Sequence, residues 1–344
     1  MAHATPIFPE ADELAAVSAR VGSDPLLVQG PGGNSSIKSG DELWVKASGV
    51  WLADAERNNI FVGLSLPRAR ELVARSGAED LGAACLPGSD PSLRPSIEAL
   101  LHLLMPHPAV LHAHAVGSMT VSVLADGPER AETALADLNW AWVPYRRPGA
   151  PLATAAVETL GGRNVDVLIL QNHGVVTGGQ SPRDAEALLR EVERRLAWPV
   201  RHLSDGPAIA GSKRYEVLPE VGPLALDANI FELVTRAALF PDQVVFLGGA
   251  VPFVAPGESL ESAAEHAEAQ SGVLPALVLV PNVGAFGLIG RTAAADAVIR
   301  GLFEVARRIP KGAETTSLTY EAVAELLAWE EEAHRVKLSR EPRE

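Results

Sequence analysis

The chain alternates between two patterns of apolar and polar residues, one with the period of an α-helix and one with the period of a β-strand. Where apolar residues recur every three or four positions, we expect helices. These segments are 9–22, 66–75, 95–105, 129–139, 151–162, 181–205, 227–238, 292–309 and 318–336. Residues 118–127 are apolar without a clear period, and we expect a helix there because a predicted strand precedes them.

Runs rich in valine, isoleucine and aromatic residues, bounded by Gly, Pro, Asn or Asp, favour short strands joined by turns. The expected strands are 59–64, 110–116, 140–145, 244–249 and 251–255, with strands and tight turns within 26–52, 164–179 and 274–290. Strands and helices that alternate in this way predict an α/β architecture. Because glycine turns join the first strands, we expect an antiparallel or mixed sheet and not a doubly wound parallel one.

The composition changes near residue 206. Residues 205–223 have few apolar positions in series, which is typical of a connector. We therefore expect one domain at 1–205 and a smaller C-terminal α/β extension at 206–344, to which the sequence assigns no role. Neither an internal repeat nor a low-complexity tract is evident.

Composition and charge then exclude several classes of protein. The chain has 344 residues, of which 47% are hydrophobic and 21% are charged, as in ordinary globular proteins. The formal net charge of −14 argues against nucleic acid or an anionic membrane as the main partner. The single cysteine excludes an intramolecular disulfide, and neither a signal peptide nor a membrane-spanning stretch is recognisable. We expect a soluble, cytoplasmic protein.

Candidate chemistry begins with residues 110–114, which read VLHAH. His112 and His114 are two positions apart in a predicted strand, so their side chains point to the same face. Zinc accepts histidine nitrogens and prefers three or four ligands. His173, in LILQNHGVV, would complete a three-histidine site with an open position for substrate. The alternative is that these are ordinary histidines at strand ends and turns.

A candidate acid or base precedes the two histidines. Glu98, in RPSIEALLH, is predicted to lie one turn inside a helix, with His102 on the same helix face. A carboxylate there is favoured by the helix dipole. If it faces a cavity instead, it becomes a candidate general acid or base.

Two glycine-containing stretches are candidate anion contacts. These are QGPGGNSSIK at 29–38 and VKASG at 45–49, where backbone amides and polar side chains can act as donors. The first nearly matches the dinucleotide-binding fingerprint. A strand is predicted after it where the fingerprint requires a helix, which excludes that interpretation.

The motifs GGNSS, KASG, PSIE, HAH and QNHG follow one another in this order, and with them the chain resembles the class II aldolase/adducin family of fuculose-phosphate and rhamnulose-phosphate aldolases from about residue 10 to 205. The resemblance implies a three-layer α/β/α sandwich with a central, mainly antiparallel sheet. It implies that His112, His114 and His173 bind zinc or another divalent metal, and that Glu98 is the catalytic acid/base. The positions that match the family's substrate-phosphate contacts are Asn34, Ser48, Gly49 and Ser96.

The same resemblance bears on the rest of the chain and on assembly. Residues beyond 206 are similar to the corresponding part of aldolase halves in aldolase–dehydrogenase fusions. A homotetramer is implied as well. Two departures affect the substrate: Ile97 stands where the family often has a second serine, and Tyr145 is only a loose substitute for a tyrosine of the fuculose-phosphate branch. Lys46 is a further, weaker candidate contact.

The expected function is reversible aldol cleavage of a hydroxylated ketose, with or without a phosphate. Zinc would stabilise the enediolate, and Glu98 would transfer the proton. A metal-dependent decarboxylase of a β-keto sugar acid would use the same enediolate, and a metal-free adducin-like scaffold is the alternative from another class. The expected partner is a small sugar or sugar acid, whose identity and stereochemistry the sequence leaves open.

Overall fold

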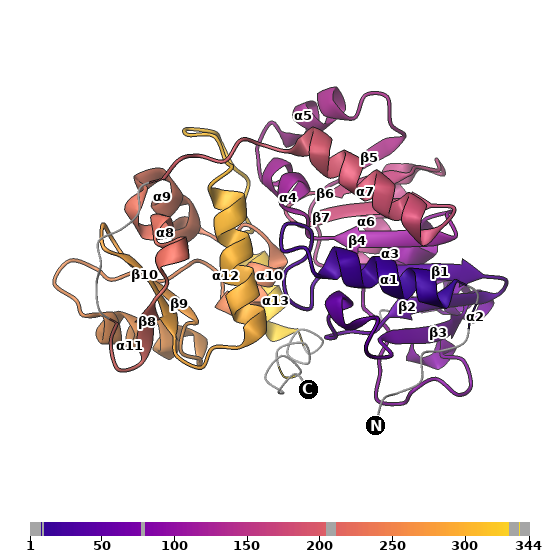
Figure 1. The fold of residues 1–344 in the computed structure, drawn as a ribbon, viewed down its shortest axis with the longest axis horizontal. Helices are drawn as coiled ribbons and strands as arrows, with labels where there is room; N and C mark the ends of the chain where they lie inside the picture. Colours follow the sequence, from indigo (N-terminus) through magenta and orange to yellow (C-terminus); the bar gives the residue numbers. More distant parts are fainter. Residues whose placement is uncertain (1–7, 9, 77–79, 204–210, 330–336, 338–344) are drawn as a thin grey trace. The chain divides into compact units, whose positions relative to one another are not determined.

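The computed structural model describes residues 8, 10–76, 80–203, 211–329 and 337. It divides into two compact units (Figure 1). The larger unit comprises Met1–Ser122 and Gly127–Ala197, and the smaller unit comprises Val123–Asp126 and Trp198–Glu344. The boundary predicted after residue 205 lies outside the described residues.

A seven-stranded sheet in the order β3-β2-β1-β4-β7-β6-β5 forms the centre of the larger unit (Figure 1). The strands are β1 Asn34–Ser39, β2 Glu42–Lys46, β3 Phe61–Ser65, β4 Ala109–Ala113, β5 Trp140–Val143, β6 Val167–Leu170 and β7 Gly174–Gly179. Neighbouring strands are antiparallel except β5 and β6, which are parallel. The prediction of a mainly antiparallel, mixed sheet is confirmed.

Helices cover both faces of this sheet. Apolar residues of α3 (Ala99–Leu104) and α6 (Ala150–Leu160) pack on one face in a cluster with β4, β6 and β7, while α2 (Leu66–Ser76) covers β2 and β3. The opposite face carries α1 (Ala11–Gly22), α4 (Val116–Ser122) and α7 (Pro182–Leu196), with α5 (Gly127–Ala134) packed on α4 and α7 (Figure 1). This arrangement confirms the three-layer α/β/α sandwich. It also buries β4 at every position, because neighbouring strands and both helix layers enclose it.

The sequence of α7 shows why a helix forms there. Ser181 accepts a hydrogen bond from the Asp184 amide at 3.2 Å, and the Asp184 carboxylate accepts one from the Ser181 amide at 3.0 Å. This capping box satisfies amide groups that the first turn cannot pair within the helix. Buried apolar residues then recur at helical spacing as far as Leu196, so the helix ends before the predicted residue 205.

The smaller unit has a three-stranded sheet in the order β8-β10-β9 and a set of short helices. Its elements are β8 Tyr215–Val217, α8 Pro223–Leu226, α9 Ala228–Arg236, α10 Pro241–Leu247, α11 Leu260–Ser271, β9 Leu277–Val280, β10 Gly284–Leu288, α12 Ala293–Ala306 and α13 Tyr320–Ala328. The hairpin predicted within 274–290 and the helices predicted at 227–238 and 292–309 are confirmed. The helix predicted at 318–336 is confirmed as far as Ala328, and 330–336 lie outside the described residues.

Two strand predictions in the smaller unit are wrong. Residues 244–247 belong to α10, which begins with Pro241 and ends before Gly248 at a positive φ of 86°. A short apolar run cannot be assigned from its period alone, and these two punctuating residues mark a helix. Residues 251–255 form only an isolated parallel bridge, between Phe253 and Leu279. Helix α11 was not predicted, because its only buried residues are Ala263 and Ala264.

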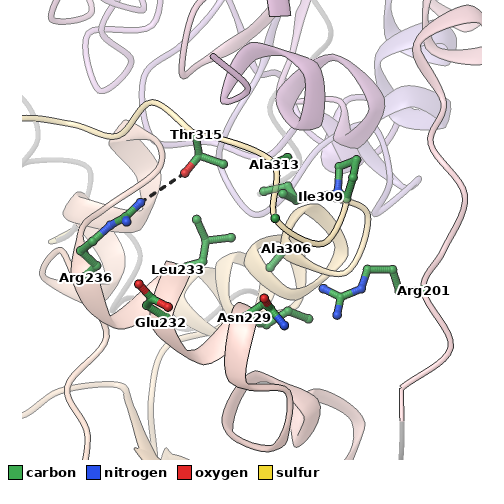
Figure 2. A pocket seen from close by; sticks show the side chains of 12 residues that line it. Arg201, Asn229, Glu232, Leu233, Arg236, Ala306, Ile309, Ala313 and Thr315 are labelled. Carbon is green, nitrogen blue, oxygen red and sulfur yellow. Dashed lines mark hydrogen bonds between the residues drawn. The ribbon is translucent and has the colours of Figure 1, made fainter. Parts of the chain in front are cut away.

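A cavity of about 150 Å³ opens on the smaller unit beside α9 and the segment that follows α12 (Figure 2). Two arginines line it, and both are engaged: Arg201 pairs with Asp227 at 2.5 Å, and Arg236 donates to the Thr315 hydroxyl at 3.4 Å. No helix in the described part of the chain has the length and apolar character needed to cross a membrane.

Candidate metal centre

The end of β4 and the turn between β6 and β7 bring three histidines together. His112 pairs with Val176 of β7, and Ala113 pairs with Val175, so this register sets the β6–β7 turn beside the end of β4. His173 is carried by that turn, and His114 is the first residue after β4. All three imidazoles are buried. The predicted strand at 110–116 therefore ends earlier than expected, at Ala113, and His114 still faces the cluster.

Gly174 allows the turn to approach β4 this closely. A Cβ atom on Gly174 would lie 2.3 Å from the carbonyl oxygen of Ala113 and 3.3 Å from the Cα of His114. Asn172, in the left-handed region at φ 54°, reverses the chain direction before it. The His173 amide closes the turn with a 3.1 Å hydrogen bond to the Leu170 carbonyl.

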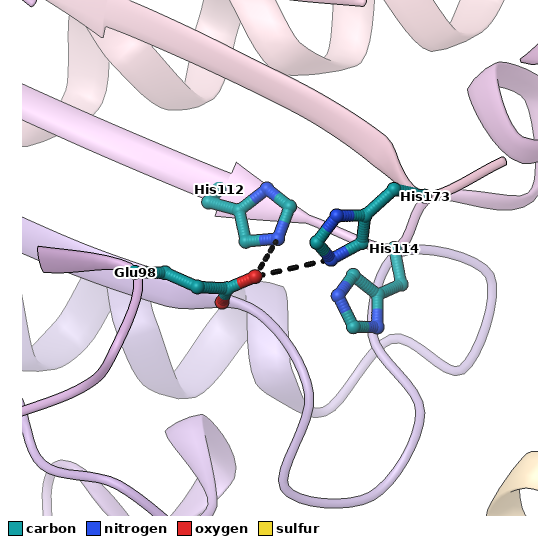
Figure 3. Close-up of side chains that lie close together, drawn as sticks. All are labelled: Glu98, His112, His114 and His173. Atoms are coloured by element: carbon teal, nitrogen blue, oxygen red, sulfur yellow. Dashed lines mark ion pairs between the residues drawn. The ribbon is translucent and has the colours of Figure 1, made fainter. Parts of the chain in front are cut away.

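The three rings and one carboxylate form a compact cluster (Figure 3). Ring centroids lie 5.0 Å apart for His112 and His114, 5.0 Å for His112 and His173, and 5.1 Å for His114 and His173. One carboxylate oxygen of Glu98 lies 3.3 Å from His112 Nε2 and 3.0 Å from His173 Nε2. One potential ligand atom from each of the four residues lies within 4.8 Å of all the others, which fits a divalent metal.

A hydrogen bond orients the first of these imidazoles. His112 Nδ1 lies 3.0 Å from the Val175 carbonyl oxygen. A carbonyl oxygen only accepts hydrogen bonds, so Nδ1 carries a proton and Nε2 is the ring nitrogen that faces the cluster. Metal-binding histidines are typically oriented by such a bond from their other ring nitrogen.

Glu98 lies at the start of α3, and the prediction that it lies one turn inside the helix is wrong. It is the residue that precedes Ala99, with φ −89° and ψ 0°. Pro95 forms an isolated bridge with Ala47, and the Ser96 amide donates to the Lys46 carbonyl at 3.3 Å. These contacts hold residues 94–96 beside the segment at Lys46 and Ala47, so the helix begins only after Glu98, whose carboxylate reaches the histidines.

Burial and mutual contacts determine the protonation states of the cluster. Burial tends to raise the pKa of the Glu98 carboxyl, but the charge and hydrogen bonds of His112 and His173 outweigh it and hold that pKa well below its usual range. Burial lowers the pKa of His173 to about 4. The structure thus favours an ionised carboxylate at Glu98 beside a neutral imidazole at His173, and these are the states in which both groups bind a metal.

His102 is buried on α3 with its Nδ1 2.7 Å from the Ser36 hydroxyl, and burial lowers its pKa to about 3. In the unfolded chain a histidine titrates near 6.5. Between these values the unfolded state binds more protons than the folded state. We therefore expect the free energy of unfolding of the metal-free protein to fall as the pH drops from about 6.5 toward 4, by about 1.4 kcal/mol per pH unit each for His102 and His173.

Urea denaturation of the metal-free protein at several pH values in this range measures the effect. His102→Gln is expected to reduce the slope against pH. His202→Gln, at an exposed position, is the matched control and leaves the slope unchanged. A free energy of unfolding that stays constant down to about pH 5 would contradict the prediction.

The structure places most of the predicted substrate contacts on segments next to the cluster. Asn34 pairs with His112 across β1 and β4, and the described residues offer its buried side-chain nitrogen no hydrogen-bond acceptor. Ser48 and Ser96 lie on adjoining segments, since the Ser48 amide donates to the Arg94 carbonyl at 2.9 Å. Gly49 follows Ser48 with a positive φ of 75°.

The two weaker candidates are held by other contacts. Lys46 is buried, and its amine donates to the Pro31 carbonyl at 3.0 Å, in the loop before β1. Tyr145 lies beside the turn that carries His173, because its amide donates to the Gln171 side chain at 3.1 Å.

One supporting residue was not predicted. The Glu193 carboxylate on α7 accepts hydrogen bonds from the amides of Gly117 at 2.7 Å and Ser118 at 2.9 Å. These amides begin α4, directly after His114, where a negative charge is favourable. Glu193 thus fixes the segment that follows this histidine. The sequence offers no signal for it, because Glu193 is one of several charged residues on α7.

The chain is similar to several known proteins. The family model for the class II aldolase and adducin N-terminal domain matches residues 12–199. An uncharacterised oxidoreductase of Bacillus subtilis (strain 168), YuxG, is 29% identical over 242 residues, and the match covers 66% of this chain but only 34% of that protein.

Among solved structures, the N-terminal class II aldolase domain of a conserved protein from Thermoplasma acidophilum is 27% identical, with a TM-score of 0.48 over 56% of this chain and 95% of that chain. The L-fuculose-1-phosphate aldolase from Thermus thermophilus is 18% identical, with a TM-score of 0.37 over 54% of this chain and 91% of that chain.

Proposed function

Because the chain belongs to the class II aldolase and adducin family, we propose that it is a metal-dependent aldolase that cleaves or forms a carbon–carbon bond of a hydroxylated ketose. The observation that carries this proposal is the cluster of Glu98 with His112, His114 and His173 at the end of β4. An adducin-like scaffold would have no need of three buried imidazoles around one carboxylate.

The three imidazoles would hold a divalent cation, for which zinc is the proposed identity. Three neutral ligands leave the full positive charge on such an ion, and when bound it would act as a Lewis acid toward the negative charge that develops on the substrate oxygens. Glu98 faces His112 and His173 from the start of α3. Its place therefore serves either as a fourth ligand or as a base beside the ligands, and we propose the base.

Glu98 would remove the hydroxyl proton when the carbon–carbon bond breaks. Its low pKa keeps it ionised and ready to accept that proton. Asn34, next to His112, would donate from its side-chain amide to a substrate oxygen. Ser48, Gly49 and Ser96 would bind the distal anionic or hydroxylated end of the substrate.

Ile97 favours a substrate whose distal group needs fewer hydrogen-bond donors than a phosphate. It is a buried apolar residue directly between Ser96 and Glu98, where it offers no side-chain donor. A sugar or sugar acid without a phosphate is compatible with an apolar residue at this position. A β-keto sugar acid that loses carbon dioxide is such a substrate. The decarboxylase is thus the second candidate function.

The test combines metal content with product analysis. Elemental analysis of the purified protein is expected to give about one zinc per chain. Ketoses, their phosphates and β-keto acids are then screened for aldehyde release and, separately, for carbon dioxide release. Aldehyde without carbon dioxide supports the aldolase, and carbon dioxide release replaces it with the decarboxylase. Protein that binds no metal even when zinc is supplied would leave only the scaffold.

A homotetramer in the cytoplasm is part of the same proposal. Sedimentation of the purified protein tests the assembly, and fractionation of cells tests the location. A monomer with full activity would contradict the proposed tetramer but not the proposed active site.

A further inference from the structure

The hairpin and helix that carry His173 have a counterpart in the smaller unit. In the larger unit these elements are β6, β7 and α7, and in the smaller unit they are β9, β10 and α12. Asn172 and Asn282 both adopt the left-handed conformation, at φ 54° and 60°. The residue after each asparagine donates to the carbonyl three positions earlier, at 3.1 Å in one turn and 3.0 Å in the other.

The correspondence continues along both segments without insertion or deletion. The Gly178 amide donates to the Asp166 carbonyl at 2.9 Å, and in the same way the Leu288 amide donates to the Ala276 carbonyl at 3.0 Å. On the helices, Arg190 bonds Glu186 at 3.1 Å.

Arg300 bonds Asp296 at 2.9 Å in the same way. Each residue of the second segment lies the same number of positions after its counterpart in the first segment. This holds from Asp166 and its counterpart Ala276 to Arg190 and its counterpart Arg300.

A hairpin followed by a helix is common in proteins. We therefore compare the strands next to the two hairpins, to see whether the similarity extends beyond the hairpin and its helix. In the larger unit β7 pairs on its far side with β4, with Val176 opposite His112. In the smaller unit β10 pairs with β8 in the same antiparallel sense, with Phe286 opposite Val217. Val176 and Phe286 each lie two residues beyond the glycine that follows the turn, so Val217 holds the register position of His112.

The other edge of each sheet agrees as well. β5 runs parallel to β6, with Trp142 opposite Ile169. In the smaller unit Phe253 forms a parallel bridge with Leu279, the counterpart of Ile169. The order β4-β7-β6-β5 is thus repeated as β8, β10, β9 and the segment at Phe253.

A helix that contacts the turn is also repeated. The Asn172 amide donates to the Ser122 carbonyl in α4 at 3.2 Å, and the Asn282 amide donates to the Ala225 carbonyl in α8 at 3.0 Å. Each helix follows the first strand of its set, β4 or β8. A chance likeness of one hairpin explains neither this bond nor the repeated strand order.

We infer that residues 215–306 are a second copy of the half-domain at 109–196, in which the three metal ligands have been replaced. Val217 takes the place of His112, Pro219 follows two residues later in the place of His114, and Val283 follows the left-handed asparagine in the place of His173. Val217 and Val283 pack against the same apolar cluster of the smaller unit. The smaller unit therefore keeps the framework of a metal site without its ligands.

The copy also lacks the first half of the larger unit. In the described residues before β8, which are 198–203 and 211–214, there is neither a strand to pair with β8 as β1 pairs with β4 nor a carboxylate in the role of Glu98. The chain is thus expected to bind one catalytic metal ion and not two. Residues 215–306, which the proposed function does not involve, thus form a framework that once bound a metal and no longer does.

Rebuilding the site tests the inference. The variant Val217→His, Pro219→His, Val283→His is prepared in a background in which His112, His114 and His173 are alanine. Val217 and Val283 are half-buried and Pro219 is exposed, so none of the new imidazoles has to fit inside a closed core. Equilibrium dialysis against Co²⁺ is expected to give about one ion per chain, with the intense visible absorption of a four-coordinate site.

The matched control moves three histidines to neighbouring positions, as Glu216→His, Glu220→His, Asn282→His. These side chains are exposed, and Glu216 lies on the opposite face of β8 from Val217. We expect at least tenfold weaker Co²⁺ binding by the control. Equal binding by two folded proteins would overturn the inference.

A second variant decides the question if the triple replacement does not fold. Val217→His, Pro219→His leaves the turn at Asn282 unchanged and is expected to bind Co²⁺ more weakly than the triple variant, yet more tightly than the control. Binding no tighter than the control would overturn the inference here too. If the native histidines bind no metal but the rebuilt site does, the proposed function fails and this inference remains.

Discussion

Replacing Glu98 with glutamine is expected to lower turnover by about 10²–10⁴-fold while the protein keeps its metal. Glutamine preserves the shape of the side chain and one oxygen that accepts a hydrogen bond, but it cannot take up a proton. The carboxylate lies 3.0 Å from His173 Nε2, and its neighbours keep it ionised. The variant therefore removes the group that would accept the proton. The expected loss is the usual contribution of a positioned acid or base.

Elemental analysis of the same sample separates the roles that the geometry allows. If Glu98→Gln retains the metal and loses turnover, Glu98 is the base. Loss of the metal would make Glu98 a ligand, and full turnover with bound metal would remove it from the mechanism. Glu186→Gln is the matched control, because this buried carboxylate on α7 pairs with Arg20 and Arg190 and lies outside the cluster.

Replacing His112 and His114 with alanine is expected to remove the metal and to reduce turnover by at least about 10³-fold. A bound cation contributes several kcal/mol of charge stabilisation in the transition state, and each 1.4 kcal/mol changes the rate tenfold. Two of the three imidazoles are lost, so His173 alone cannot hold the ion against buffer. The measurement is zinc content and turnover on one preparation, before and after addition of zinc.

His107→Ala is the control for loss of a histidine as such. His107 pairs with Asp166 at 2.8 Å and is not part of the cluster, so this variant is expected to keep both metal and turnover. Metal retained by the double variant would show that the ion binds elsewhere in the chain. A double variant that retains turnover without metal would exclude the proposed mechanism.

The candidate metal ligands and the type of sheet could be predicted because both depend on local sequence patterns. The pair at His112 and His114 shares a face by the geometry of any strand, and the turn after β6 is marked by Asn172 and Gly174. The position of Glu98 could not be predicted, because hydrogen bonds that join Ser96 and Arg94 to the distant segment at Lys46 and Ser48 shift the start of α3.

In the smaller unit, two features could not be predicted from the sequence pattern: helix α10 and the repeated half-domain. Val244 and Val245 favour a strand, yet they lie in a seven-residue helix that begins at Pro241 and ends before Gly248. The repeated half-domain was not visible in the sequence because only scattered positions, such as Asn172 and Asn282, remain identical. Its likeness lies in hydrogen bonds and register, which aliphatic residues of many kinds can satisfy.

The place of β4 in the centre of the sheet has a consequence for how the chain folds. β4 pairs with β1, which lies far earlier in the sequence, and with β7, which lies far later. Such distant pairings carry a large loop-closure cost and slow folding. His173 reaches His112 and His114 only after β4 has paired with β7. The ion therefore enters a sheet that has already formed, and unlike a zinc finger this chain is expected to reach its native topology without metal.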